Sequence, residues 1–247
     1  PGEFPKQPAS YIYRNTNGQF VDVTEELCPD LKNLGMVTSA HFEDYNLDGK
    51  ADLLIMGEYM ALTLFINDGN KFVKQNTDLK TEGVWMSSIS LDIDNDGDLD
   101  IIAGNLGLNT KFKASFEKPF NIYGNDFDKN GTMDIVLSAY YDSIEYPIRG
   151  KECSTQQMPF ISEKFETYDG FAKATLTDIY EDELESSIHV TARTFESSVF
   201  VNDGHGNFSM QPLPIESQIS VITTIEHLDV NNDGLQDILV FGNWYNV

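Results

Sequence analysis

Cysteine and basic residues are scarce in this sequence of 247 residues. Its only cysteines are Cys28 and Cys153, which are too few for a disulfide framework or a four-thiolate zinc site. Sixteen Lys and Arg residues stand against forty Asp and Glu residues, so the formal net charge is −24. This charge repels nucleic acid and anionic lipid surfaces. We therefore expect cations as partners, and no nucleic acid.

Motifs of the common catalytic sites are also missing. The sequence has no G-x-S-x-G elbow, P-loop, H-E-x-x-H helix or C-x-x-C pair, and its four histidines are isolated. It contains no apolar run long enough to span a membrane, and it opens at Pro1 without an export leader. Hydrophobic residues (40%) and aromatic residues (12%) are spread along the chain, which predicts a folded domain.

One acidic pattern occurs four times: Asp-x-(Asp/Asn)-x-(Asp/Asn)-Gly-x-x-Asp. The copies, here called loops 1 to 4, begin at Asp44, Asp92, Asp126 and Asp229. Each is followed by a short apolar run that is typical of a buried strand. Fourteen of the forty acidic residues lie in these loops, so the acidity is concentrated and not merely a solvated surface.

A second pattern, rich in Asn, Asp and Gly and ending in Phe, occurs at residues 15–20, 67–72 and 202–208. These residue types tolerate positive φ, as hairpin turns require. Loop 1 and loop 2 begin 48 residues apart, with the turn at 67–72 between them. This cycle of loop, strand, turn and strand suits one blade of a four-stranded β-propeller.

The fold class predicted is therefore all-β, a β-propeller of four-stranded blades, with about four to five blade equivalents in the sequence. Residues 1–247 form a single propeller domain or a fragment of one. Only 34 residues separate the starts of loops 2 and 3, which predicts a shortened blade there, whereas 103 separate loops 3 and 4. The long interval holds either an unmarked blade or, as we favour, an insertion within one blade. Helical spacing of apolar residues predicts a helical insertion at about 150–190, either a cap or a docking element.

Alternating aspartates in a tight loop offer the oxygen ligands that calcium requires, about six to eight in number. We expect the side chains at loop positions 1, 3, 5 and 9 and the carbonyl at position 7 to bind up to four calcium ions, with loop 2 binding most tightly. The residues are Asp44, Asn46, Asp48, Lys50 and Asp52; Asp92, Asp94, Asp96, Asp98 and Asp100; Asp126, Asp128, Asn130, Thr132 and Asp134; and Asp229, Asn231, Asp233, Leu235 and Asp237.

Other metal sites fit these loops less well. An EF-hand places Glu at position 12, where these loops have Ile55, Ala103, Leu137 and Val240. Magnesium demands stricter octahedral geometry, and zinc prefers nitrogen and sulfur ligands. The competing interpretation is that the loops are Asp-rich turns without a ligand. Because unneutralised carboxylates repel one another, we expect calcium to support the fold itself.

The loops, the strands that follow them and the turns together resemble the FG-GAP/VCBS repeats of integrin α-subunit propellers and of many bacterial exported proteins. Gly57, Gly104 and Gly242 stand where that family has its Phe-Gly element, although the full FG-GAP string is not reproduced. The resemblance implies a propeller, often seven-bladed, with calcium in the loops of individual blades. It also implies adhesion or ligand binding in an extracellular, cell-surface or periplasmic location.

These features favour a non-catalytic scaffold that binds calcium and a carbohydrate or protein ligand. An alternative is a polysaccharide lyase or hydrolase on a calcium-bearing propeller, with Glu145, Glu152, Glu163 or Glu166 on its open face. A third hypothesis is a structural spacer of a larger surface protein, with no ligand beyond calcium. No catalytic residue is assigned from the sequence, and whether the chain is an enzyme stays open.

Overall fold

The computed structural model describes residues 4–243, and these divide into two compact units. The inserted unit comprises Pro1–Gln7, described from residue 4, together with Phe112–Arg193. The blade unit comprises Pro8–Lys111 and Thr194–Val247, described to residue 243. The chain thus leaves the blade unit once and returns to it. Whether residues 1–247 belong to one domain stays a prediction.

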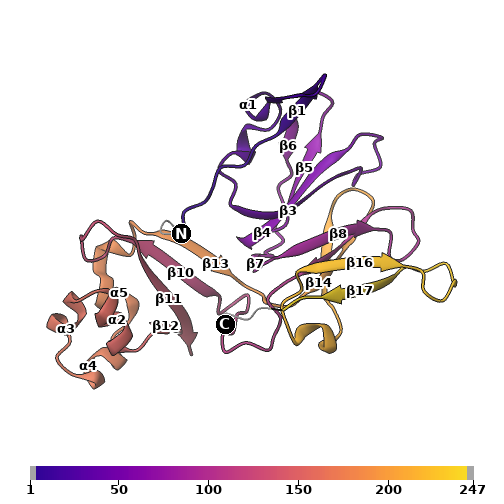
Figure 1. Cartoon of the computed structure of the whole chain (residues 1–247). Helices are drawn as coiled ribbons and strands as arrows, with labels where there is room; N and C mark the ends of the chain where they lie inside the picture. The colour runs from indigo at the N-terminus through magenta and orange to yellow at the C-terminus, as the bar shows by residue number, and fades with distance from the viewer. Residues whose placement is uncertain (1–3, 244–247) are drawn as a thin grey trace. The chain divides into compact units, whose positions relative to one another are not determined.

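The blade unit consists of antiparallel sheets (Figure 1). Its first sheet has the order β3-β4-β5-β6, with β7 also pairing with β4, and its second has the order β15-β14-β9-β8. Two hairpins, β1-β2 and β16-β17, form two-stranded sheets. The strands are β1 (Tyr13–Thr16), β2 (Gln19–Asp22), β3 (Met36–Glu43), β4 (Asp52–Met60), β5 (Thr63–Asn67), β6 (Phe72–Lys74), β7 (Gly83–Val84), β8 (Ser87–Leu91), β9 (Asp100–Gly104), β14 (Ser198–Asn202), β15 (Phe208–Pro212), β16 (Thr224–Leu228) and β17 (Asp237–Phe241). Short helical turns are α1 (Thr24–Leu27), η1 (Pro29–Leu31) and η3 (Ile215–Gln218).

The apolar runs after loops 1 and 2 form strands that are buried on both faces. The buried strand predicted after loop 4 is not found, because β17 is mostly exposed. In β4, Leu54 packs in the core shared with β9 and β14, while Leu53 packs on the opposite face with the helical turns near Leu31. In β9, Ile101 belongs to the first of these cores and Ile102 to another that includes residues of β16. A fully buried Leu or Ile contributes about 1.5–3 kcal/mol. Sheets stacked face to face therefore explain why these strands lack polar alternation.

The first strands of successive sheets are neighbours. β8 lies against both β3 and β16 (Figure 1). The ring Nε2 of His41 on β3 lies 2.8 Å from the Ser88 hydroxyl on β8, and the Ser87 hydroxyl donates to the carbonyl of Ile222, just before β16, at 3.0 Å. Sheets that stack with their first strands side by side have the arrangement of consecutive propeller blades. The all-β fold with four-stranded blades is confirmed.

The second blade is assembled from both sides of the inserted unit. β9 pairs with β14, although 93 residues lie between Gly104 and Ser198. The buried Asn105 directly follows β9, and its side chain bonds to two other segments of the blade unit. Its Oδ1 accepts the Val84 N–H at 3.0 Å, and its Nδ2 donates to the carbonyl of Thr194, just before β14, at 3.2 Å. The prediction of a shortened blade between loops 2 and 3 is therefore wrong, because the chain enters the inserted unit in this interval. Loop 3 belongs to the inserted unit.

The inserted unit has its own four-stranded sheet, of order β12-β11-β10-β13. Because the last strand pairs with the first one, this sheet is not the simple meander of the first blade. Its elements are β10 (Phe120–Asn125), β11 (Asp134–Tyr141), β12 (Ile144–Pro147), α2 (Lys151–Gln157), α3 (Phe160–Lys164), α4 (Tyr168–Lys173), α5 (Leu176–Tyr180), η2 (Glu181–Glu183) and β13 (Ile188–Ala192).

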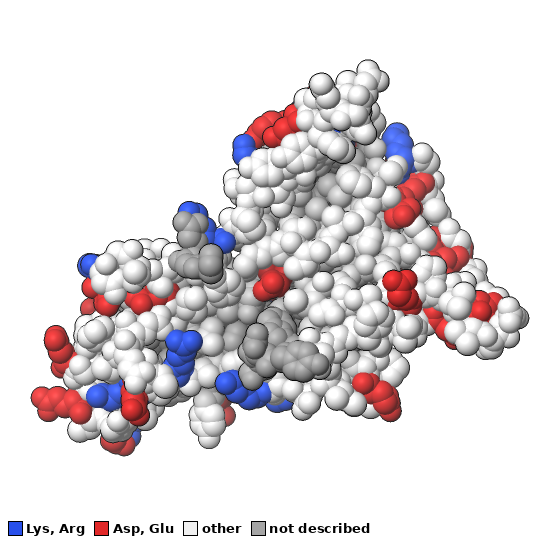
Figure 2. Space-filling model, viewed as in Figure 1, with Lys and Arg blue, Asp and Glu red and all other residues white. Residues whose placement is uncertain are grey.

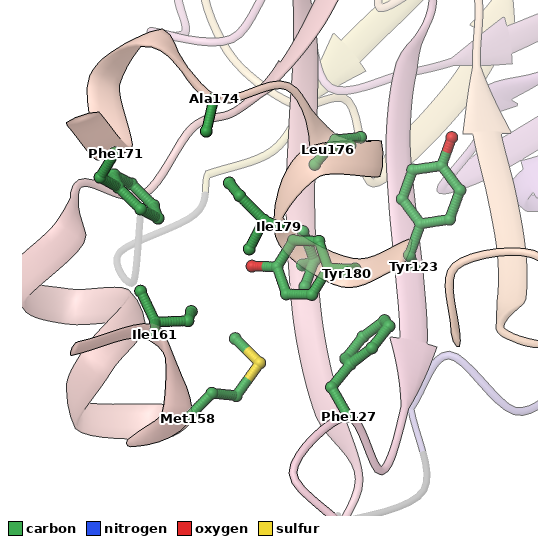
Figure 3. Packing of buried hydrophobic residues seen from close by; sticks show 10 residues of the cluster. Tyr123, Phe127, Met158, Ile161, Phe171, Ala174, Leu176, Ile179 and Tyr180 are labelled. Atoms are coloured by element: carbon green, nitrogen blue, oxygen red, sulfur yellow. The ribbon is translucent and has the colours of Figure 1, made fainter. Parts of the chain in front are cut away.

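The helices of the inserted unit cover one face of its sheet. Met158, Ile161 and Leu176 from the helical segment pack with Tyr123 and Phe127 from the sheet side in one buried cluster (Figure 3). Local capping also favours these helices. At the start of α5, the Thr175 hydroxyl accepts the Asp178 N–H, and the Asp178 carboxylate accepts the Thr175 N–H, which is a capping box.

Candidate metal centres

All four acidic loops have the same backbone. Each joins two antiparallel strands and begins one residue after a register pair, such as Glu43 with Asp52. Position 4 is left-handed in each, with φ between 59° and 61°, and the glycine at position 6 has φ between 84° and 95°. A Cβ on any of these glycines would meet no atom within 4 Å. Glycine is therefore required there for its conformation and not for space.

The aspartate at position 1 is oriented by the loop backbone. In loop 2, the Asp92 carboxylate accepts the N–H of Asp96 at 3.2 Å and the N–H of Gly97 at 3.1 Å. The same two hydrogen bonds occur in the other three loops. Since a carboxylate has about four lone-pair positions, it can still bind a cation while it accepts these bonds.

The aspartate at position 9 connects each loop to its surroundings. Asp100 accepts the N–H of Ile93 at 3.0 Å and, through its other oxygen, the N–H of Asn202 at 2.8 Å. Asp52 is held in the same way by Asn67 at 2.8 Å. In loop 3 a residue of α2 takes this place, since the Gln157 amide donates to Asp134 at 3.3 Å.

These capping residues were not among the site residues expected from the sequence. The sequence identifies the Asn that opens each turn motif only as a turn former. In the first and second blades, however, its backbone N–H also donates to the last loop aspartate. Its side chain also donates to the carbonyl at position 8, at 2.9 Å from Asn67 and 3.2 Å from Asn202. The spacing of 15 residues between Asp52 and Asn67 could have revealed the pairing, but the inserted unit hides it in the second blade.

Three carboxylates converge in loops 2 and 3. Oxygen atoms of Asp92, Asp94 and Asp100 lie within 4.8 Å of one another, and the same holds for the equivalent residues Asp126, Asp128 and Asp134. Converging oxygens of this kind could hold a metal ion, with calcium as the hard cation that oxygen sets prefer. Loops 1 and 4 carry Asn46 and Asn231 at position 3 and so lack the third carboxylate.

The side chains at position 5 lie outside these groups of three. The carboxylate of Asp96 accepts the N–H of Asp98 at 3.1 Å, and Asp48, Asn130 and Asp233 bond in the same way to the N–H at position 7. Position 5 therefore orients the residue whose carbonyl is the predicted ligand at position 7.

Asp98, at position 7 of loop 2, is an unexplained buried charge. Its side chain belongs to a residue that is only 3% exposed, and its Oδ1 has no hydrogen-bond partner among the described residues. Burial, followed by the charges of the neighbouring loop carboxylates beginning with Asp96, raises the pKa of Asp98 to about 6. A buried carboxylate oxygen without a donor is costly. Asp98 is not one of the three carboxylates that converge in loop 2, so the fit of this loop to a cation rests on Asp92, Asp94 and Asp100.

Loops 1 and 4 have features that oppose metal binding. In loop 1, the Nζ of Lys50 lies 2.9 Å from the Asp48 carboxylate, so a side-chain cation already occupies the loop. In loop 4, Asp237 is exposed, whereas the equivalent Asp52, Asp100 and Asp134 are each at most 2% exposed. The four loops thus share a backbone but differ in charge and burial.

Residues 44–103 match the FG-GAP-like repeat family. The chain therefore contains an FG-GAP-like repeat. The matched segment runs from the first residue of loop 1 to Ala103 in β9, so it contains loops 1 and 2 and the whole first blade after β3. No curated protein and no solved structure shows a significant match to the chain. Among residues 4–243, no helix has the length and apolar character needed to cross a membrane.

The Phe-Gly element of the FG-GAP-like repeat has a steric basis here. A Cβ on Gly57 would lie 2.1 Å from the carbonyl oxygen of Met36, and one on Gly104 would lie 2.3 Å from that of Ile222. Gly242 meets the Val221 carbonyl in the same manner at 2.3 Å. Glycine at these three positions, after loops 1, 2 and 4, therefore permits close approach of another backbone segment.

The glutamates named for the enzyme alternative are placed differently. Glu145 on β12 accepts hydrogen bonds from the Asn121 amide at 2.6 Å and from the Ser138 and Tyr123 hydroxyls. The Oδ1 of Asn121 in turn lies 3.0 Å from Nε2 of the His189 ring. Glu152, Glu163 and Glu166 are exposed in the helical segment. Glu145 is therefore fixed as a hydrogen-bond acceptor within the sheet of the inserted unit.

Proposed function

We propose that this FG-GAP-like repeat protein is a calcium-binding β-propeller scaffold that presents a ligand-binding surface outside the cytoplasm. Loop 2 carries the proposal. Its three converging carboxylates, on Asp92, Asp94 and Asp100, offer the oxygen ligands that calcium prefers, and a bound cation would neutralise their mutual repulsion.

Calcium has a structural role in this proposal. Loops 2 and 3 each close a hairpin between the first two strands of a sheet. Without a cation, three carboxylates within 4.8 Å repel one another at the strand ends. Bound calcium neutralises this repulsion and holds the ends of the two strands together. Any ligand that binds only the native state raises its stability, by an amount that grows with the logarithm of the ligand concentration above the dissociation constant.

The location follows from the affinity expected of such loops. Calcium sites in extracellular modules typically have dissociation constants of about 10⁻⁴–10⁻³ M, which suits compartments rich in calcium. The FG-GAP-like repeat favours the same compartments. We therefore propose an extracellular, cell-surface or periplasmic protein whose ligand is a carbohydrate or a protein.

Thermal unfolding with and without calcium tests this function. Protein treated with EGTA and then dialysed should melt at a lower temperature than the same protein in millimolar calcium. Magnesium at equal concentration should restore little of the difference, because it dehydrates reluctantly and demands octahedral geometry. Identical melting curves in calcium and EGTA would contradict the proposal and leave the loops as acidic turns.

A further inference from the structure

The inserted unit contains an open groove with an unusual lining. The groove has a volume of about 670 Å³ and lies between the end of the sheet, at β12, and helices α2 and α4. Three basic residues line it, Arg149, Lys151 and Lys173, and none of its lining residues is acidic. The chain as a whole has forty acidic and sixteen basic residues, and acidic side chains are scattered over the face shown in Figure 2. A basic groove is therefore a local reversal of the protein's charge.

The groove is also aromatic, and its aromatic rings are available. Tyr141 is 76% exposed and Tyr168 is 67% exposed, although both line the groove. The Nζ of Lys151 lies 5.4 Å from the centre of the Tyr168 ring, so a cation and an open ring stand side by side. A ligand in this place meets positive charge and flat apolar surfaces together.

The floor of the groove is rigid. Phe171 and Ala174 line it and also belong to the buried cluster of the inserted unit (Figure 3). Arg149 is positioned by a 2.8 Å hydrogen bond from its Nη1 to Gln157 on α2. Lys173 has an exposed partner, Asp169, at 2.7 Å, and such an exposed pair is weak and easily exchanged for another anion.

The edge strand beside the groove argues against a peptide that adds a strand to the sheet. The Ile148 N–H donates to the Leu137 carbonyl at 2.9 Å, so alternate residues of β12 point toward β11. Glu145 and Pro147 are then the residues whose backbones face outward, and Pro147 has no N–H to donate. An edge with proline in this position is a poor template for another strand.

From this lining we infer that the groove binds an anionic oligosaccharide, with carboxylates on its sugar rings. The apolar face of a pyranose ring packs on an exposed tyrosine, while ring carboxylates pair with Arg149, Lys151 and Lys173. The volume lies in the range of about 300–1,000 Å³ typical of ligand sites, and the open shape suits a chain. This inference rests on the proposed scaffold function, for which it names the class of ligand.

Calorimetry with a galacturonic acid hexasaccharide tests the inference. The protein is first loaded with calcium, and free calcium is then removed, because uronates bind calcium themselves. Wild-type protein should bind the hexasaccharide, with a dissociation constant that rises with salt concentration. The carboxyl-reduced, neutral hexasaccharide should bind at least about tenfold more weakly. Absence of binding to the acidic hexasaccharide, or equal binding of the neutral one, would overturn the inference.

Two variants locate the site. Lys151→Gln combined with Lys173→Gln should raise the dissociation constant about tenfold, because two ion pairs are lost. The matched control combines Lys113→Gln with Lys118→Gln, which removes the same charge from exposed residues of the inserted unit outside the groove lining, and should change it less than about twofold. An equal loss in both variants would show nonspecific attraction and overturn the site.

Tyr168→Ala separates a saccharide from a simple polyanion. It should weaken hexasaccharide binding while leaving the affinity for a hexaglutamate peptide unchanged, since the peptide offers no ring face to stack. Wild-type binding of hexaglutamate as tight as that of the hexasaccharide would overturn the carbohydrate assignment in favour of an acidic peptide. Calcium titration of the groove variants should match wild type, so failure of the groove is distinguishable from failure of the calcium sites.

Discussion

Loops 1 and 2 have the same frame and different chemistry. Both place a left-handed residue at position 4, both orient the first aspartate by two backbone N–H groups, and both have the last aspartate capped by a turn Asn. Loop 2 then brings together three carboxylates, whereas loop 1 has Asn46 in place of one of them and a lysine, Lys50, paired to Asp48. The backbone geometry of a loop and the number of carboxylates that converge in it are therefore separable in this protein.

Loop 3 extends the comparison, because it keeps this frame in a different sheet. The inserted unit does not follow the strand order of the first blade, yet its loop converges three carboxylates as loop 2 does. The donor to the last loop aspartate differs as well, since it is Gln157 on α2 in place of the Asn of a turn. The repeated structural element is thus the hairpin with its acidic loop, and the blade is built around it.

The largest effect should come from removing one carboxylate from each converging group. Asp94 is exposed and Asp128 is half-buried, so Asn at these positions removes a charge with little change in packing. Calcium at one hundred times its dissociation constant stabilises by about 2.7 kcal/mol per site, or roughly 5–10 °C for a chain of this size. We expect Asp94→Asn with Asp128→Asn to lose about half of the calcium-dependent rise in Tm, because each site is weakened about tenfold. Asp30→Asn with Asp78→Asn, exposed acids outside the loops, should keep it.

A substitution at Gly104, which follows loop 2 in β9, should lower stability whether or not calcium is present. Gly104→Ala places a Cβ 2.3 Å from the Ile222 carbonyl oxygen, and overpacking against backbone costs about 1–3 kcal/mol. Urea unfolding should show this loss both in calcium and in EGTA. Gly150→Ala is the control, because a Cβ there meets no atom within 4 Å. A stable Gly104→Ala variant would contradict the steric basis given to the Phe-Gly element.

Exchanging position 3 between the two loops tests whether this residue sets the affinity. Asp94→Asn should weaken the tightest calcium site about tenfold, and Asn46→Asp should strengthen the site of loop 1 by a similar factor, because one full charge is lost or gained. Calorimetric titration of each variant against wild type measures both changes. If the exchange had no effect on either affinity, the side chain at position 3 would not be what sets the difference between the two loops.

A smaller effect is expected from Lys50. Lys50→Gln removes the cation paired to Asp48 while keeping the side-chain stem, so calcium no longer competes with an ammonium group. The pair is exposed, and its loss should raise the calcium affinity of loop 1 only about two- to fivefold. The gain should shrink at high salt. Lys71→Gln, a nearby exposed lysine outside the loop, is the matched control.

The smallest effect concerns the contact between β3 and β8. Burial lowers the pKa of His41, opposed by the charge of Glu43 and by its hydrogen bond to Ser88. The folded state therefore binds fewer protons at His41 than the unfolded chain does, and its contribution is complete above the unfolded pKa of about 6.5. Stability should fall as the pH drops from about 7.5 to about 5.5. In His41→Gln this part of the pH dependence should be absent.

Much of the fold could be predicted because its signals are local. The apolar runs of β4 and β9 follow their loops directly, and the spacing of Ile161, Leu176 and Ile179 matches helices that pack in one cluster. The path of the chain could not be predicted, since it depends on pairings between distant segments. Nothing local indicates that Asn202 caps Asp100, or that β13 returns to pair with β10.

The positions of the candidate metal loops could be predicted from the sequence, but the differences in charge and burial among them could be predicted only in part. The pattern identified every loop, and the backbone of each loop is the same. The differences depend on neighbours, such as the burial of Asp98 near the turn at Gly204, where a Cβ would lie 3.3 Å from the carboxylate. The basic groove was not predicted, because Lys151 on α2 and Lys173 on α4 come together only when these two helices pack against each other.

Calorimetric titration of the metal-free protein with calcium tests the central claim most directly. The account predicts two tighter sites, in loops 2 and 3, and no more than weak binding in loops 1 and 4. Asp94→Asn with Asp128→Asn should weaken both tighter sites about tenfold. No heat of binding up to millimolar calcium, or tight binding that survives in this double variant, would contradict the assignment of the converging carboxylates as calcium sites.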